Sequence, residues 1–297
     1  MINDTSKEFI RRHIGPSEED MGKMLKFIGA NSLDDLIKKT VPEEILLKDK
    51  LKINNPTSEH ESMKEVKIIS EKNKLYKNYI GMGYYNTYMP NVILRNIYCN
   101  PGWYTAYTPY QPEVAQGRLE MLLNFQQMVI DFTGMDIANA SLLDESTAAA
   151  EAIGLSRRLD KNNSNKIFIS QDCNPQTIDV IKTRTEVFGL KLIIGDQDKD
   201  LSNVDGNIIC GVISYPGTLG DIKDPSEAIS KIHKKNGKAI LVCDLLALAK
   251  LKTPAELGAD IAVGNSQRFG IPMGYGGPHA AFFATKDENK RAMPGRI

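Results

Sequence analysis

The sequence predicts an α/β fold in which a mostly parallel sheet is covered by helices on both faces. Short apolar runs alternate with helical segments in the second half of the 297-residue chain, as expected for parallel strands joined by crossover helices. Hydrophobic residues make up 41% of the chain and charged residues 25%, which is typical of globular proteins rather than disordered ones. A chain of this length can bury a large core.

Residues 1–78 are expected to form a helical arm, and residues 79–297 the large α/β domain. In the arm, Ser17, Ser32 and Ser58 each precede an acidic residue by three positions. This is the spacing of a capping box, in which a hydroxyl and a carboxylate satisfy the first amides of a helix.

The segment 79–116 has little periodicity and contains most of the tyrosines together with Trp103, the only tryptophan. A long irregular segment within a compact protein is usually functional or disordered. Because aromatic side chains favour packing, disorder is not expected here.

Regular elements are predicted from residue 113 onward. Two long helices are expected over 114–132 and 144–159, and crossover helices over 175–188 and 225–235. The expected strands are 166–170, 191–194, 208–214, 239–244, 260–264 and 280–285.

Composition excludes several classes of function. The 37 basic and 37 acidic residues give no net charge, whereas nucleic-acid-binding proteins usually carry a basic excess. No apolar run approaches the length of a membrane span, and the N-terminus has no signal-peptide pattern. The four cysteines form no CxxC pair, so we predict neither a metal site nor a disulfide framework, and we expect a cytoplasmic protein.

Three motifs are candidates for ligand binding, and each has a purely structural alternative. Asp244 ends an apolar run, where an acid could hold a cofactor's ring nitrogen or simply cap the next segment. Ser146 and Thr147 begin a helix, where hydroxyls and free amides could hold a phosphate or serve as ordinary caps. The glycine-rich stretch 264–283 could wrap a ligand or make a tight crossing, and His279 within it is expected to be structural. No GxGxxG or GxxxxGK[ST] motif accompanies them.

Longer motifs resemble one family. RRHIGP (11–16), NPGWYTAYTPYQPE (100–113), NASLLDESTAAAEA (139–152) and GNSQRFGIPMGYGGPHAAFFA (264–284) are similar to the N-terminal half, or subunit 1, of glycine cleavage system P-proteins. These are decarboxylating glycine dehydrogenases. The resemblance implies the large domain of a pyridoxal-phosphate (PLP) enzyme of the aspartate aminotransferase type, fold type I. It also implies that a smaller C-terminal domain is missing.

The cofactor-anchoring lysine of the family's catalytic half has no counterpart here. In that half a His-Lys pair precedes the glycine-rich loop, whereas this chain has Gln267-Arg268 and no lysine from Thr253 to Thr285. Neither an amide nor a guanidinium can replace the amine. The resemblance therefore implies a degenerate site in which Ser146, Thr147 and Asp244 occupy cofactor-binding places and Gln267 lies near the lysine position.

The resemblance further implies that PLP is held mainly by the partner half, subunit 2. The pair would convert glycine and lipoyl H-protein into carbon dioxide and aminomethyl-lipoyl H-protein. The expected contributions of this chain to the partner's active site come from the aromatic segment: Tyr84, Tyr85, Tyr107, Thr108, Tyr110 and Gln111. Two alternatives remain open, a free-standing PLP enzyme using Lys250 or Lys252 and a non-catalytic interaction subunit.

Overall fold

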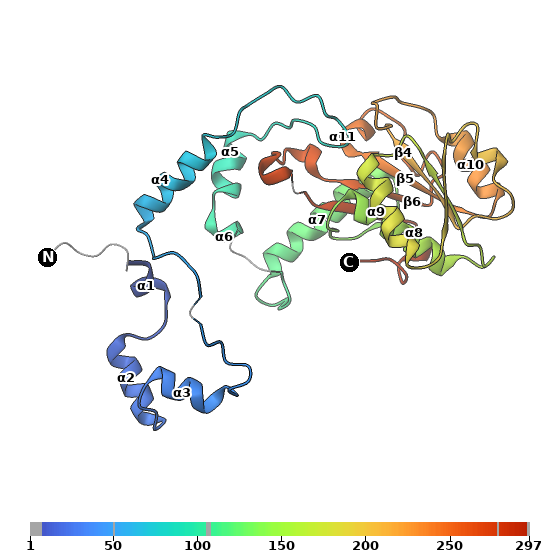
Figure 1. Cartoon of the computed structure of the whole chain (residues 1–297). Coiled ribbons are helices and arrows are strands. Elements are labelled where there is room, and N and C mark those ends of the chain that lie inside the picture. Colours follow the sequence, from blue (N-terminus) through green and yellow to red (C-terminus); the bar gives the residue numbers. More distant parts are fainter. Residues whose placement is uncertain (1–7, 50, 105–107, 278, 296–297) are drawn as a thin grey trace. The chain divides into compact units, whose positions relative to one another are not determined.

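The computed structural model describes residues 8–49, 51–104, 108–277 and 279–295. The chain divides into two compact units, Met1–Lys77 and Asn78–Ile297, which are described separately below (Figure 1).

The described part of the first unit forms the helices α1 (Glu8–His13), α2 (Glu18–Phe27), α3 (Leu33–Thr40) and α4 (Glu59–Ser70). The predicted serines begin three of them. Ser17, Ser32 and Ser58 each accept a hydrogen bond from the backbone amide three residues ahead. At Ser58 the capping box is complete, because the Glu61 side chain also accepts from the Ser58 amide.

The second unit is built on a seven-stranded sheet with the strand order β1-β7-β6-β5-β4-β2-β3. The strands from β6 to β3 in this order are parallel, whereas β7 is antiparallel to both of its neighbours. Their bounds are β1 Ile137–Ala138, β2 Lys166–Ser170, β3 Lys191–Gly195, β4 Cys210–Tyr215, β5 Lys238–Asp244, β6 Ile261–Asn265 and β7 Ala281–Thr285.

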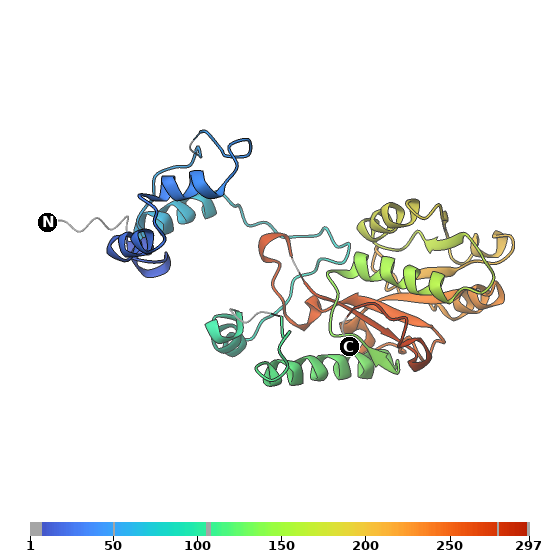
Figure 2. The same cartoon turned by 90° about the horizontal axis from the view of Figure 1, so that it is seen from below.

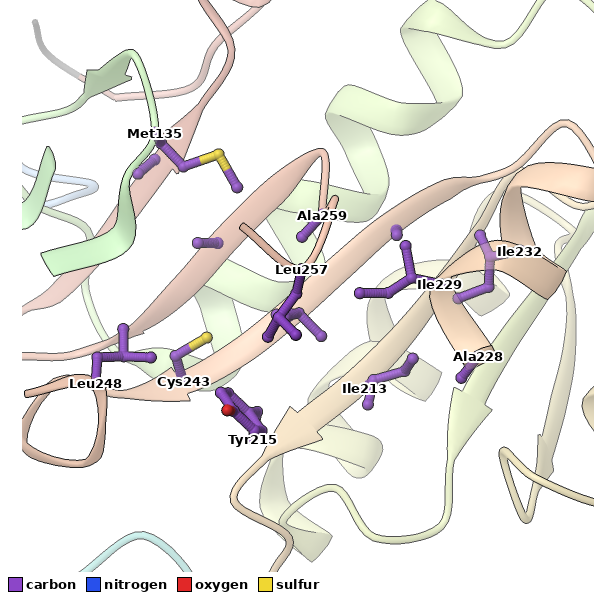
Figure 3. Close-up of a cluster of buried hydrophobic side chains, with 14 of the residues drawn as sticks. Met135, Ile213, Tyr215, Ala228, Ile229, Ile232, Cys243, Leu248, Leu257 and Ala259 are labelled. Carbon is purple, nitrogen blue, oxygen red and sulfur yellow. The ribbon is translucent and has the colours of Figure 1, made fainter. Parts of the chain in front are cut away.

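Helices cover both faces of this sheet (Figure 2). One face packs against α8 (Glu145–Leu159) and α9 (Pro175–Glu186). The other packs against α7 (Gln116–Thr133), α10 (Ser226–Lys234) and the short α11 (Leu245–Leu248). Because successive strand residues point to opposite faces, Ile240 and Leu241 belong to different core clusters. The cluster under α10 includes Ile213, Ile229 and Ile232 (Figure 3).

The remaining elements are short. The aromatic segment contains α5 (Asn91–Ile93), the π-helical turn η2 (Leu94–Tyr98) and α6 (Pro101–Tyr104). The described residues also form the 3-10 turns η3 (Leu201–Asn203), η4 (Gln267–Phe269), η5 (Gly274–Gly276) and η6 (Asp287–Asn289).

The predicted α/β class is confirmed, with local differences. The strand expected at 208–214 runs from Cys210 to Tyr215, and the Ile208 amide before it donates to the Lys235 carbonyl oxygen just after α10. The two-residue β1 was not predicted, and segment 79–116 is more helical than expected. Among the described residues, no helix combines the length and apolar character that crossing a lipid bilayer requires.

Candidate functional site

A cavity of about 280 Å³ opens at the carboxyl ends of the parallel strands. Ser214 of β4, Asp244 of β5 and Asn265 of β6 line it together with Glu145 and Arg268. In open α/β sheets, ligands bind at this edge because the strands end there and the loops that follow diverge. The predicted cofactor-binding residues are therefore expected to line this cavity.

Asp244 lies in the cavity as predicted, but both of its carboxylate oxygens are engaged within the chain. Oδ1 accepts a hydrogen bond of 2.8 Å from the Leu246 amide and so caps α11. Oδ2 lies 3.4 Å from Nε of Arg268, as an ion pair rather than a close hydrogen bond. The Arg268 guanidinium in turn lies over the ring of Tyr85, with Cζ 5.0 Å from the ring centroid.

Glu145 also lines the cavity. Its two carboxylate oxygens accept hydrogen bonds from Asn174 Nδ2 at 3.0 Å and from Asn265 Nδ2 at 2.8 Å. Asn265 is itself oriented, because its Oδ1 accepts from the Gln267 amide at 3.1 Å. Burial raises the pKa of the Glu145 carboxyl, and the two amide donors oppose that shift.

The predicted phosphate-binding residues bond to their own surroundings. The buried Ser146 hydroxyl lies 3.1 Å from Thr177 Oγ1 in α9. The Thr147 amide donates to Asp144 Oδ1 at 2.7 Å, so the N-terminus of α8 is already capped by a carboxylate. Ser146 lines a small hollow beside the main cavity, and Thr147 lines neither.

Gln267, near the expected lysine position, is fully buried in η4 and does not line the cavity. Neither polar atom of its side chain has a hydrogen-bond partner among the described residues. Its neighbour Arg268 is the residue that enters the cavity from this turn.

The six aromatic-segment residues fall into different places. Tyr85 lines the main cavity, and Tyr84 lines the small hollow with Ser146. Thr108, Tyr110 and Gln111 instead line a separate depression of about 660 Å³ beside Trp103. Tyr107 lies outside the described residues.

His279 makes contacts that suit a structural role. Its Nδ1 lies 2.6 Å from the Gly277 carbonyl oxygen, and its ring meets that of Tyr84 edge-on with centroids 5.7 Å apart. The histidine therefore supports the tyrosine loop from the glycine-rich stretch.

The residues of this cavity do not fit PLP. None of the described residues that line it is a lysine, so they offer no amine to hold the cofactor. A phosphate bound at a helix start needs free backbone amides. At the start of α8 it would instead meet the carboxyl groups of Asp144 and Glu145, and the Thr147 amide already donates to Asp144. Asp244, the acid predicted to hold a ring nitrogen, is already paired with Arg268.

Sequence reasoning missed Glu145, Asn174 and Arg268 as parts of this cavity. Glu145 directly precedes the predicted Ser146, and Arg268 directly follows the predicted Gln267, so each lies one residue from a predicted position. Asn174 precedes α9 and comes from another part of the chain. Its only sequence signal is its place after β2, where polar residues at strand ends gather.

Comparison with known proteins identifies the family. A family described as glycine cleavage system P-protein matches residues 11–297. A glycine dehydrogenase (decarboxylating) of Pelagibacter ubique (strain HTCC1062) is 73% identical over the whole chain, which spans 31% of that relative. The corresponding protein of Dechloromonas aromatica (strain RCB) is 54% identical over 98% of the chain, which spans 30% of it.

Solved structures agree with this result. A crystal structure of glycine decarboxylase (P-protein) of the glycine cleavage system, in inhibitor-bound form, superposes with a TM-score of 0.83. It is 33% identical, and the match covers 95% of this chain and 64% of that one. A sphingosine-1-phosphate lyase from Burkholderia pseudomallei K96243, 12% identical with a TM-score of 0.59, shares the fold. The chain, about 30% as long as its curated relatives, belongs to the glycine cleavage system P-protein family.

Proposed function

We propose that this chain is the N-terminal part of a decarboxylating glycine dehydrogenase and acts together with the rest of that enzyme. In this proposal glycine and lipoyl H-protein are the substrates, and carbon dioxide and aminomethyl-lipoyl H-protein are the products. The observation that carries the proposal is the 73% identity over the whole chain to a relative of that name. The P-protein superposition, with its TM-score of 0.83, supports it.

We place the PLP of the reaction in the remaining part of the enzyme, the partner half. Three features of this chain support that placement: no described residue lining the cavity is a lysine, the N-terminus of α8 is capped by a carboxylate, and Asp244 is paired with Arg268. This half would then supply surface and side chains to an active site formed between the two halves. Residues 79–297 would form that surface, with residues 1–78 as a separate helical arm.

Tyr84 and Tyr85 are the residues that we favour as groups lent to the partner's site. They belong to a turn at the rim of the cavity, and both are half-buried with their rings held by neighbours. A tyrosine suits this role because it presents a hydroxyl on a rigid ring at low entropic cost. Thr108, Tyr110 and Gln111 lie around another depression and form a second, separate group of candidates.

The proposal is tested by exchange of labelled carbon dioxide with glycine in the presence of PLP and H-protein. This chain, the remaining part of the enzyme and their mixture are assayed side by side. We expect exchange in the mixture and none from this chain alone. Exchange catalysed by this chain alone would show that it holds a working cofactor and would overturn the proposed division of labour.

The alternative of a free-standing PLP enzyme receives no support from the cavity. Lys250 and Lys252 are both exposed, and neither lines the cavity that contains Asp244. Borohydride treatment of this chain with PLP distinguishes the two ideas. A pyridoxyl group trapped on one of these lysines, with activity lost when that lysine is changed to arginine, would favour the alternative.

The other alternative is a subunit that only assembles with its partner. Tyr85→Phe separates it from a subunit that contributes to the chemistry, because the substitution keeps the ring and removes only the hydroxyl. Lost turnover with unchanged assembly would favour a lent group, and unchanged turnover would favour an interaction role for this position.

A further inference from the structure

Residues 81–85, here called the tyrosine turn, contact the start of α9 through their backbone. The Tyr84 amide donates to the Gly81 carbonyl oxygen at 3.0 Å, closing a turn whose central residues, Met82 and Gly83, have φ of 53° and 87°. The Gln176 side chain donates to the Met82 carbonyl oxygen. A Cβ at Gly83 would lie 2.9 Å from Asn174 Nδ2, so the turn lies directly on the start of α9.

A second set of contacts holds the segment that follows. Thr87 Oγ1 donates to the Ile271 carbonyl oxygen at 2.9 Å. A Cβ at Gly270 would lie 2.8 Å from the Tyr88 carbonyl oxygen, so the glycine-rich loop packs closely against this backbone. The main chain around Tyr85 is therefore fixed on both sides, and its ring orientation depends on what contacts the ring.

Arg268 contacts the ring, and its own position is set by Asp244. The guanidinium lies 5.0 Å from the Tyr85 ring centroid, while Nε faces Asp244 Oδ2 at 3.4 Å. The Asp244 carboxylate cannot swing away freely, because its other oxygen caps α11. Asp244, Arg268 and Tyr85 thus form a chain of contacts from the end of β5 to the tyrosine turn.

A guanidinium is suited to this place in a way that an ammonium is not. It is planar, so it can stack on a ring face while its edge meets a carboxylate. The side chains of Arg268 and Asp244 are 21% and 22% exposed, and Arg268 is the only Lys or Arg among the described residues that line the cavity. Its loss would leave the Asp244 carboxylate without its ion-pair partner.

We propose that Arg268 is a positioning residue: held by Asp244, it fixes the ring of Tyr85 for use in the active site formed with the partner half. The cavity that does not fit PLP thereby serves as the support for the tyrosine turn. This inference rests on the proposed function for the role of Tyr85, whereas the contact between Arg268 and the ring can be tested without that function.

The first test is spectroscopic and uses the assembled full-length enzyme. 3-Fluorotyrosine is incorporated at position 85, and its ¹⁹F resonance is compared in the parent and in Arg268→Lys, which keeps the charge next to Asp244 and removes the planar stack. We expect the resonance to shift. Arg157→Lys is the matched control, because Arg157 Cζ lies 4.5 Å from the ring centroid of Phe188, away from Tyr85, and it should leave the resonance in place.

The second test is a double-mutant cycle on glycine decarboxylation with Arg268→Lys and Tyr85→Phe. A small displacement of a group in an active site can cost about 100-fold in rate, so we expect Arg268→Lys to lower kcat by about 10- to 100-fold with assembly and KM for H-protein unchanged. In the Tyr85→Phe background, Arg268→Lys should lower kcat only a little further. Independent effects would instead multiply.

The outcomes distinguish this inference from the proposed function. An unshifted ¹⁹F resonance in a properly assembled Arg268→Lys enzyme, or rate losses that multiply, would overturn the positioning role. A shifted resonance in an enzyme whose turnover is insensitive to Tyr85→Phe would support the contact and refute the lent tyrosine. If Arg268→Lys fails to assemble, Asp244→Asn is measured instead, and it should shift the same resonance.

Discussion

At the scale of single residues, Asp260 joins several elements at the amino end of β6. Its carboxylate accepts hydrogen bonds from His233 at 2.8 Å and the Ala239 amide at 2.9 Å, and it meets Lys286 at 3.0 Å. Burial alone would raise the pKa of this carboxyl. The His233, Ala239 and Lys286 hydrogen bonds and the nearby Lys238 charge outweigh burial and hold the pKa well below its usual range.

We therefore expect Asp260→Asn to be strongly destabilising at neutral pH. Removing one partner from a buried charge network typically costs about 3–5 kcal/mol. Because the folded-state pKa is depressed, the stabilisation is present above the unfolded-state pKa, near 3.8, and is lost as pH falls below it. Urea unfolding at several pH values should show the parent and the variant converging in acid.

Asp179→Asn is the control for this measurement. Asp179 forms an exposed pair with Lys182 at 3.1 Å, and such surface pairs contribute about 0–1 kcal/mol. A penalty at Asp260 no larger than that at Asp179 would contradict the role assigned to the buried carboxylate.

The four cysteines differ in their burial, and we expect their reactivity to differ accordingly. Burial raises the pKa of the thiols of Cys173, Cys210 and Cys243, whereas Cys99 is exposed. Because the thiolate is the reactive form, we expect iodoacetamide to label only Cys99 in the native protein and all four cysteines in denaturant. Mass spectrometry of the labelled peptides makes the measurement, and rapid native labelling of any second cysteine would contradict it.

At the scale of elements, the close spacing of β5, β6 and β7 depends on Gly264. A Cβ there would lie 2.2 Å from the Cys243 carbonyl oxygen and 2.5 Å from the Phe282 ring. Neither atom can move aside without shifting the sheet, so we expect Gly264→Ala to cost about 1–3 kcal/mol or more, as overpacked cores do.

Gly154→Ala provides the matched comparison within α8. The nearest atom to its Cβ would be Arg158 Nη1 at 3.6 Å, an ordinary contact. Because alanine restricts the unfolded chain and favours helix, this change should stabilise the protein by about 0.4–1 kcal/mol. The two substitutions should therefore shift the midpoint temperature of thermal unfolding in opposite directions. A shift of both midpoints in the same direction would refute the steric argument at Gly264.

Most of the sheet could be predicted from sequence because its elements carry strong local signals. The strand 166–170 was placed to the residue, since a buried parallel strand is a short continuous apolar run. The two-residue β1 has no such signal, because its pairing depends on β7, which lies far along the chain. The turn of Tyr84 likewise depends on contacts with Asn174 and Gln176 of the α9 region.

The candidate site was predicted in part for the same reason. Asp244 could be found because it ends a strand, and ligands of α/β sheets bind there. Its pairing with Arg268, and the hydrogen bonds from Asn174 and Asn265 to Glu145, join residues from distant segments. Periodicity and capping patterns describe neighbours in sequence, so they cannot show which distant side chains meet.

At the scale of the whole molecule, the aromatic segment leaves large apolar side chains uncovered. Tyr79 is 87% exposed and Tyr88 96% exposed, and Val92 and Ile97 are also exposed. Large apolar side chains left exposed in one segment are typical of an interaction site. Because the chain spans about 30% of its curated relatives, we propose that the remaining part of the enzyme covers this segment.

Hydrogen exchange can test this covering directly. Amides in residues 79–104 should exchange more slowly when this chain is assembled with the rest of the enzyme than when it is alone, because partner packing excludes water and suppresses local opening. Helix α10 is the internal control, since Ala228, Ile229 and Ile232 already pack into the core of this chain. Its exchange should change little on assembly. If sedimentation shows that the complex forms but residues 79–104 stay unprotected, the interface lies elsewhere on the molecule. Protection confined to this segment would make its tyrosines part of the surface shared between the halves.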